Sequence, residues 1–243
     1  MKQLVLDLAR LPPPTLDNFV TGGNAELLQN LHRLAARPAP DAAERFIYVW
    51  GLPGSGRSHL LRGVVAAVRA AGAGAAYIAC AAGVAFAEDA ARMDCVAVDD
   101  AERLDGAAQV ALFNLYNAIR EGRGTLLVSG NAPPVQLAMR PDLVTRLGWG
   151  LVYQVHALSD EEKAQALAQH GAGRGFRLSA EVCAYLLQRA HRDMPSLLAL
   201  LDALDRYSLE TKRQITVPLV RELLHAAPED GKRQSQADIE GGG

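Results

Sequence analysis

A glycine-rich segment, "GLPGSGRSHLL", directly follows an apolar run that ends at Trp50, and it constrains the fold more than any other stretch. Gly51, Gly56 and Ser58 fit the phosphate-loop pattern, with Arg57 where lysine is usual. The glycines allow successive backbone N–H groups to face an anion, and a following helix adds the positive end of its dipole. Ser58 is placed to hold Mg²⁺, and Arg57 keeps the positive charge on a bulkier, planar group. A glycine-rich turn without a ligand is the alternative.

Five short apolar runs typical of strands alternate with helical patterns between residues 15 and 157. The runs are "RFIYVW", "AAYIAC", "DCVAVD", "GTLLVS" and "LVYQVHAL". Within residues 105–123, apolar side chains recur at helical spacing, at Leu112, Leu115, Tyr116 and Ile119. Short buried strands that alternate with helices predict an α/β domain over residues 15–157, with a parallel sheet covered on both faces.

From residue 158 to residue 227 only helical signals occur. Ser159 and Glu162 have the spacing of a capping box, and Gly171 is expected to end that helix. Further helices are expected to begin at Ser179, near Pro195 and at Thr216. The third of these four helices carries leucines on one face, at Leu197, Leu200, Leu201 and Leu204. This segment therefore predicts a small all-helical domain, followed by a disordered tail over 228–243.

Composition narrows the class of protein. With 49% hydrophobic and 21% charged residues, the 243-residue chain has the make-up of an ordinary globular protein with a sizeable core. Its formal net charge of −2 gives no long-range field for holding a DNA backbone. Cys80, Cys95 and Cys183 match no metal-binding spacing and are expected to be buried, in a reducing compartment.

The uncharged segment 70–87 approaches the length of a membrane span. It consists mostly of Ala and Gly, and three glycines interrupt it, Gly72, Gly74 and Gly83. A helix end, a short buried strand through Tyr77 and Ile78, and a new helix start fit the segment better. No membrane span is expected.

A second motif supports the phosphate loop. The run "CVAVDD" predicts a buried strand that ends in Asp99 and Asp100, where a nucleotide-bound metal and an attacking water need carboxylates. The alternative is a solvated helix cap. Loop and acids together, in a chain of alternating strands and helices, indicate nucleotide binding.

Several segments in this order resemble the DnaA branch of the AAA+ ATPases. They are "TLDNFVTGGN", "GRSHLL", "VAVDDAERL", "LFNLYNAIREG", "SGNAPPVQL", "RPDLVTRLGWG" and "LSDEEKAQAL". Within that branch, Arg57 and the N-terminal "QLVLDL" resemble the Hda-type proteins, which are regulatory inactivators of the initiator DnaA. The resemblance runs from Gln3 to about Ala226. It implies a five-stranded sheet of order 5-1-4-3-2, followed by a helical lid.

The resemblance implies ADP or ATP, with Mg²⁺, as cofactors. The residues expected to bind the nucleotide are Gly51, Leu52, Pro53, Gly54, Ser55, Gly56, Arg57, Ser58 and His59, with Phe19 and Val20 lining the base. Ser58 and Asp99 would hold the metal. Asp100 takes the place where related proteins carry a water-activating glutamate, and Asn131 matches the sensor of the γ-phosphate. Two alternatives stay open, a turn-forming Asn131 ahead of Pro133 and Pro134, and an apolar pair, Phe19 and Val20, packed on the core.

Arg146, in "VTRLGWG", matches the arginine finger, which acts on nucleotide held by a neighbouring subunit. An arginine there neutralises charge that develops on the transferred phosphoryl group, an effect worth roughly 10³–10⁵ in rate. The alternative is a surface arginine lying beside Trp149.

Two departures from the family pattern bear on activity. Pro195 falls at or next to the place of a second sensor arginine and offers no charge, although Arg192 lies nearby. With Arg57 for lysine as well, the chain is expected to hold a nucleotide but to turn it over slowly. No DNA-binding domain is expected after Ala226, so the chain is not expected to be an initiator.

The N-terminal "QLVLDL" resembles the short peptide by which many bacterial proteins bind the replication sliding clamp. Side chains alternate in direction along an extended peptide, so its leucines can enter apolar pockets while the Gln3 amide makes directed hydrogen bonds. The residues implied are Gln3, Leu4, Leu6, Asp7 and Leu8. The alternative is an edge strand of the chain's own sheet. The prolines at 12–14 favour a peptide held away from the core, which makes residues 1–14 a hook and spacer.

By resemblance, the chain is expected to be a negative regulator of replication initiation. It would dock on the DNA-loaded clamp and promote hydrolysis of DnaA-bound ATP, leaving inactive DnaA–ADP. Expected partners are the clamp and DnaA, with DNA contacted only indirectly, no membrane, and a homodimer as one option, in the cytoplasm. Two other classes stay open, a stand-alone P-loop ATPase or kinase and an AAA+ adaptor that loads a helicase. Appreciable hydrolysis by the isolated protein would favour the first, and helicase binding the second.

Overall fold

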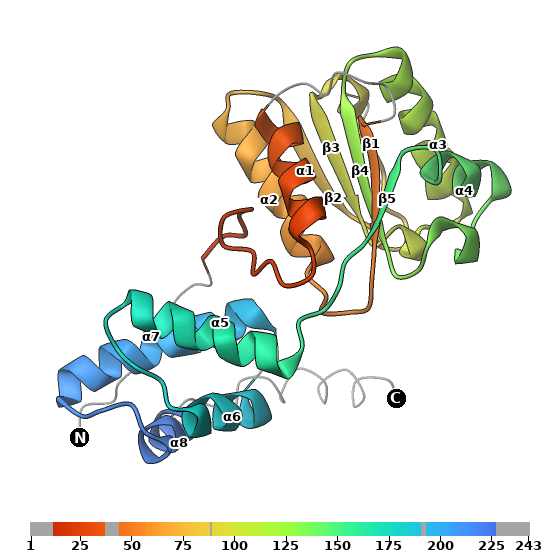
Figure 1. The fold of residues 1–243 in the computed structure, drawn as a ribbon. Coiled ribbons are helices and arrows are strands. Elements are labelled where there is room, and N and C mark those ends of the chain that lie inside the picture. The colour runs from red at the N-terminus through yellow and green to blue at the C-terminus, as the bar shows by residue number, and fades with distance from the viewer. Residues whose placement is uncertain (1–11, 37–43, 88, 191–192, 227–243) are drawn as a thin grey trace, which may run out of the picture. The chain divides into compact units, whose positions relative to one another are not determined.

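The computed structural model describes residues 12–36, 44–87, 89–190 and 193–226. They form two compact units, one of residues 13–159 and one that starts at Asp160 (Figure 1). Arg192 and the segment 228–243 lie outside the described residues. So do the residues expected to bind the clamp, Gln3, Leu4, Leu6, Asp7 and Leu8.

The first unit contains a parallel sheet with the strand order β2-β3-β4-β1-β5. The strands are β1 (Phe46–Trp50), β2 (Ala75–Ala79), β3 (Cys95–Asp99), β4 (Thr125–Gly130) and β5 (Leu151–Gln154). From the other edge this order is 5-1-4-3-2, so the expected topology is confirmed. Trp50 lies opposite Gly130 and Gln154, which brings the carboxyl ends of three strands to one edge.

Helices cover both faces of the sheet (Figure 1). One face carries α1 (Ala25–Ala36) and α2 (Arg57–Ala70), and the other carries α3 (Gly106–Glu121) and α4 (Pro141–Leu147). The described part of this unit also contains three short 3₁₀ helices, η1 (Ala90–Arg92), η2 (Ala101–Arg103) and η3 (Pro134–Gln136).

Burial on both faces explains why the central strands β1, β3 and β4 are continuous apolar runs. In β1, Phe46 and Tyr48 belong to the core under α3 and α4, whereas Ile47 and Val49 belong to the core under α1 and α2. All four side chains are at most 5% exposed. Because successive side chains of a strand point to opposite faces, a strand covered on both sides needs apolar residues at every position.

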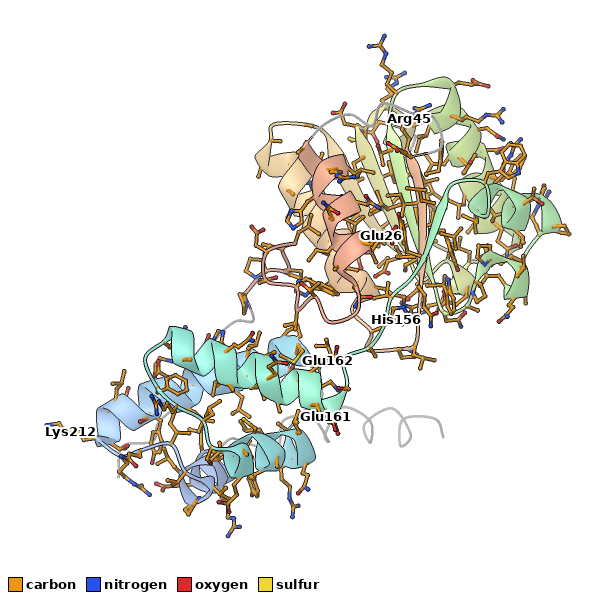
Figure 2. All side chains as sticks on the ribbon, viewed as in Figure 1. Glu26, Arg45, His156, Glu161, Glu162 and Lys212 are labelled. Carbon is orange, nitrogen blue, oxygen red and sulfur yellow. The ribbon has the colours of Figure 1, made fainter. Side chains whose placement is uncertain are left out.

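The last strand is shorter than its apolar run, which extends to Leu158. It ends at Gln154, although the Val155 N–H still donates to the Trp50 carbonyl, at 2.6 Å. Asn24, just before α1, then binds both backbone groups of His156, a residue labelled in Figure 2. Its Nδ2 donates to the His156 carbonyl at 2.9 Å, and its Oδ1 accepts from the His156 N–H at 2.8 Å. The chain therefore leaves the sheet at His156, where the Asn24 side chain takes the place of a neighbouring strand as the hydrogen-bond partner.

Arg45, labelled in Figure 2, fastens the start of β1 to the end of α3. Its guanidinium donates to four backbone carbonyls at and just after the end of α3, where a helix has fewer intrahelical donors. The acceptors are Ile119 (3.3 Å), Arg120 (3.2 Å), Gly122 (2.9 Å) and Gly124 (3.1 Å). The residue ahead of the phosphate-loop strand thus fixes that strand against the opposite layer.

The second unit consists, in its described part, of α5 (Asp160–Gly173), α6 (Ala180–Arg189), α7 (Met194–Thr211) and α8 (Val217–Ala226). Ser179 caps α6 by accepting from the Val182 N–H, at 3.3 Å. The four leucines predicted on one face of α7 are all buried. The prediction that Gly171 ends the first helix is wrong, because α5 continues to Gly173. A Cβ at Gly171 would lie 2.9 Å from a ring carbon of Phe176, so close packing requires this glycine.

The segment 70–87 differs in part from its prediction. It contains the end of α2 and the edge strand β2, in which Tyr77 and Ile78 are half-buried instead of buried. The expected helix start is absent, since residues 80–87 form no helix. All three cysteines are free and buried, and burial raises the pKa of Cys80 and that of Cys95 to about 12. Among the described residues, no helix is long and apolar enough to cross a membrane.

Candidate functional site

The phosphate loop joins the end of β1 to the start of α2, and its glycines are required by space and backbone angle. A Cβ at Gly51 would lie 2.5 Å from the Val155 carbonyl oxygen. At Gly56, φ is +101° and a Cβ would lie 2.7 Å from a ring carbon of Phe19. Gly54 also has a positive φ, +80°. L-residues rarely adopt such angles, so the sequence pattern has a direct steric cause.

Arg57 is the first residue of α2, and its guanidinium lies between two carboxylates. Nη2 donates to Asp100 Oδ1 at 3.0 Å, and Nη1 lies 3.9 Å from Glu102 Oε1. The Arg57 side chain is only 10% exposed. An arginine cannot lose its proton in a protein, so this buried cation depends on these acids for compensation.

Asp99 ends β3 and is held by hydroxyl groups from the two neighbouring strands. The Tyr77 hydroxyl, on β2, donates to Oδ2 at 2.5 Å, and the Ser129 hydroxyl, on β4, donates to Oδ1. Asp99 is 3% exposed. Burial, and then the hydrogen bond to Asp99, raise the pKa of Tyr77 to about 12, so Tyr77 remains a donor at neutral pH.

Asp100 adopts a backbone conformation that non-glycine residues rarely use, with φ 58° and ψ 54°. Its N–H donates to Ser129 Oγ at 2.8 Å, so Ser129 links the two acids. The Asp100 side chain makes no capping bond to η2 and instead accepts from Arg57. The helix-cap alternative therefore does not describe Asp100. Strained residues of this kind cluster at functional sites.

Glu102 is a site residue that sequence reasoning missed. It lies in η2, its side chain is 21% exposed, and burial is the main cause that raises its pKa above the usual value. Arg57 and a backbone hydrogen bond with Asn131 act in the opposite direction, whereas the charge of Asp100 raises the pKa further. The available signal was a third acid three positions after the strand end, in "DDAERL".

Buried polar atoms without partners gather at this site. In the part of the chain that the structure describes, five buried side-chain atoms have no hydrogen-bond partner: Ser55 Oγ, Arg57 Nη1, Glu102 Oε2, Asn117 Oδ1 and Arg146 Nη1. Three of the five surround the phosphate loop. Since buried polar groups are nearly always satisfied, Ser55 Oγ and Arg57 Nη1 are two donors that fit a phosphate group.

The residues expected to hold a metal, Ser58 and Asp99, follow β1 and end β3. Among the described residues, no group of three or more His, Cys, Asp or Glu side chains could hold a metal ion. A carboxylate oxygen has two lone pairs, so Asp99 can still accept beyond its two hydroxyl donors. Mg²⁺ usually keeps waters and takes phosphate oxygens as further ligands, and two protein groups suit that mode.

The segment ahead of α1 packs on the start of α2. The Phe19 and His59 rings lie 5.6 Å apart, and Phe19 also packs against the core under α1 and α2. His59 Nε2 lies 2.8 Å from Asn18 Oδ1 and 2.9 Å from the Thr15 carbonyl, and burial lowers the His59 pKa. Phe19 therefore both borders the phosphate loop and packs on the core. Val20 is half-buried.

Asn131 follows β4, so it lies at the same sheet edge as the phosphate loop. Its side chain is exposed. The neighbouring Ala132 carbonyl accepts from the buried Tyr48 hydroxyl at 2.7 Å, which fixes the turn. The structure brings Asn131 near the acids through its backbone contact with Glu102.

Arg146 lies apart from these residues, in α4 on the other face of the sheet. Its guanidinium carbon stands 4.1 Å from the Trp149 ring centre, 5.7 Å from that of Phe113 and 5.8 Å from that of Tyr116. It also lines a hollow with Phe46, at the amino end of β1. The phosphate loop follows the carboxyl end of that strand, so Arg146 is not part of the loop site. The remaining departure residue, Pro195, lies in the first turn of α7 in the other unit.

Two family models match the chain. The model of the bacterial DnaA ATPase domain covers residues 12–154, more than half of the 243 residues, and the Hda lid-domain model covers residues 160–224. Domain III of DnaA from Thermotoga maritima is a similar solved structure, with a TM-score of 0.66 and 19% identity over 88% of this chain and 96% of that one.

Two further structures share the fold. AMPPCP-bound DnaA from Aquifex aeolicus has a TM-score of 0.62 at 18% identity, over 83% of this chain and 70% of its own. A RuvB mutant from Thermotoga maritima has a TM-score of 0.59 at 14% identity, over 88% and 72%. With its sheet order and its two matched domains, the chain belongs to the family of bacterial DnaA ATPase domains, as a DnaA-related AAA+ protein of the Hda type.

Proposed function

We propose that this protein is a negative regulator of replication initiation that lends Arg146 to DnaA and promotes hydrolysis of DnaA-bound ATP. The observation that carries the proposal is the separation of its two site arginines. Arg57 borders the chain's own phosphate loop, whereas Arg146 lies on the opposite face of the sheet, beside the 55%-exposed Trp149. A guanidinium that cannot serve its own loop is suited to nucleotide on a neighbouring protein.

At its own loop the protein holds ADP or ATP with Mg²⁺. Ser55 Oγ and Arg57 Nη1, both buried without partners, would bind phosphate, with Ser58 and Asp99 at the metal. The metal would neutralise phosphate charge when bound. The similar DnaA structure from Aquifex aeolicus is AMPPCP-bound, which supports a nucleotide here. Asp100 already accepts from Arg57, so it is poorly placed to activate water, which favours slow intrinsic turnover over a stand-alone ATPase.

Arg146 acts through charge. Its guanidinium would neutralise negative charge that develops on the phosphoryl group transferred in DnaA, and the aromatic rings beneath it hold its orientation without neutralising it. The two proteins would meet in the cytoplasm on the DNA-loaded sliding clamp, which this chain would bind through its N-terminal residues Gln3, Leu4, Leu6, Asp7 and Leu8.

The test is a single-turnover assay of ATP bound to DnaA, with clamp loaded on DNA and the full-length protein. The double variant Leu6→Ala/Leu8→Ala removes two anchoring side chains, each worth roughly 1.5–3 kcal/mol when buried. We expect stimulation to collapse while the melting temperature hardly moves, with the single variant Val5→Ala as the matched control. Undiminished stimulation by the double variant would reject clamp docking through this segment, and unfolding would make the segment a strand of the domain.

A further inference from the structure

Glu102 and Arg57 are arranged as a contact that a bound phosphate would disrupt. Arg57 Nη1 and Glu102 Oε2 are both buried and both lack a hydrogen-bond partner, although Nη1 lies only 3.9 Å from the other oxygen of Glu102. At that separation the charges attract but form no hydrogen bond. A pair that served the fold alone would be expected to close. The open geometry leaves a donor of Arg57 unused beside the phosphate loop.

We infer that Glu102 is a positioning residue that competes with bound phosphate for Arg57 and takes up a proton when a nucleotide binds. The inference rests on the proposed nucleotide site. Phosphate oxygens at the loop would attract Arg57 away from Glu102 and would bring negative charge close to that carboxylate. Both changes disfavour the ionised form of Glu102. The proton comes from solvent and forms an O–H bond on the carboxyl group, while Arg57 keeps its own proton.

The surroundings of Glu102 make it the group that responds. Burial already raises its pKa in the free protein, and Arg57 is the cation that opposes this. The other ionisable groups coupled to it are Asp100, Tyr48 and Cys80. Burial raises the pKa of Tyr48 and of Cys80, so both stay neutral between about pH 6 and 8. Asp100 keeps a direct hydrogen bond from Arg57, which Glu102 lacks.

The sign of the pH dependence follows. At about pH 8 an ionised Glu102 weakens nucleotide binding, whereas at lower pH, toward the raised pKa of Glu102, more of the free protein carries the proton already and the penalty shrinks. Glu102→Gln is neutral at every pH. One unit of pKa corresponds to tenfold in affinity, so at pH 8 wild type should bind ADP about tenfold more weakly than Glu102→Gln for each unit by which the nucleotide raises the pKa of Glu102. The ratio of the wild-type to the Glu102→Gln dissociation constant should approach one as the pH falls.

The experiment is titration calorimetry of the full chain with ADP and Mg²⁺, repeated from pH 8 down to the lowest pH at which the protein stays folded. Protonation of ADP itself affects both proteins equally and cancels in the ratio. The control is Glu121→Gln, which changes an exposed residue at the end of α3. Its ADP affinity should depend on pH as that of wild type does. Glu102→Asp keeps the charge and should keep the pH dependence, which a merely structural role would not require.

The outcomes separate the inference from the function on which it rests. A ratio of the wild-type to the Glu102→Gln dissociation constant that rises with pH supports the inference. Equal affinities with the same pH dependence, or weaker binding by Glu102→Gln throughout, would overturn the inference and leave the nucleotide site standing. Failure of wild type and variant alike to bind ADP at millimolar concentration would reject the nucleotide site, and the inference with it.

Discussion

Two arginines of this protein, the buried Arg57 and the half-buried Arg146, differ in the kind of their neighbours. Arg57 lies between Asp100 and Glu102, so the chain's own acids compensate its charge. Arg146 lies on the rings of Trp149, Phe113 and Tyr116. Within the part of the chain that the structure describes, Arg146 forms no ion pair. Each has one buried nitrogen without a hydrogen-bond partner.

The difference in neighbours determines how each guanidinium can interact with an anion. A ligand of Arg57 can use the unpartnered Nη1, but it competes with Asp100 and Glu102 for the charge of the guanidinium. Aromatic faces attract a cation through their quadrupole but leave its net charge intact. Arg146 can therefore meet an anion on another molecule without breaking an ion pair. The first arrangement suits a cation that holds a ligand, and the second suits one that acts on a partner.

The largest effect on binding of the protein's own nucleotide is expected from removing the first cation. Arg57→Ala leaves two carboxylates facing the loop and removes a charged hydrogen-bond donor worth about 1.5–3 kcal/mol. Affinity for ADP should fall about 10- to 100-fold by calorimetry. Arg123→Ala, an exposed arginine before β4, should bind ADP as wild type does. Unchanged ADP affinity in Arg57→Ala would mean that Arg57 does not contact the nucleotide.

A smaller effect is expected from the rings beneath Arg146. Cation–π contacts are worth about 0.5–2 kcal/mol, so Trp149→Ala should slow stimulated hydrolysis of DnaA-bound ATP by about 2- to 30-fold. Trp149→Phe keeps a ring and should retain most of the activity. Both variants should bind ADP normally, because Trp149 lies on the Arg146 side of the molecule. Full stimulation by Trp149→Ala would show that stacking does not orient Arg146.

The smallest effect is expected on stability, at Ser55. Its hydroxyl is buried without a partner, so Ser55→Ala should leave the free energy of unfolding unchanged or raise it by about 1 kcal/mol, while ADP binds more weakly. Ser129→Ala is the matched comparison. It removes hydrogen bonds to both Asp99 and Asp100, and should lower the free energy of unfolding by about 1–3 kcal/mol. Denaturation in urea measures both, and equal losses would mean that the Ser55 hydroxyl serves the fold.

Much of the fold could be predicted because burial imposes simple patterns. The central strands β1, β3 and β4 are apolar runs since both faces are covered, and the α7 leucines recur at helical spacing. The errors have local causes. Gly171 was expected to end a helix, but it lies within α5, where its lack of a side chain makes room for the ring of Phe176. The run after Leu151 leaves the sheet early because Asn24, more than a hundred residues away, binds His156.

Only those parts of the site that consist of consecutive residues could be predicted from the sequence. The loop and the pair Asp99–Asp100 are adjacent in sequence to the strands that place them. Tyr77 and Ser129 contact Asp99 only because β2 and β4 flank β3, a relation that spacing does not reveal. Glu102 gains its role from Arg57, which comes from another element. Contacts of this kind depend on strand order and need the structure.

The most direct test of the division between the two arginines is one hydrolysis assay with two variants. ATP is bound to DnaA in advance, and the full-length protein is added with clamp loaded on DNA. Arg146→Ala should lose stimulation by roughly 10³-fold or more while it still folds and binds ADP and clamp, and Arg146→Lys should recover little, because a point charge does not reproduce the planar fork. Arg57→Ala, assayed at saturating ADP, should retain stimulation. Hydrolysis near the wild-type rate with Arg146→Ala would contradict the claim that this arginine acts on the nucleotide of a partner.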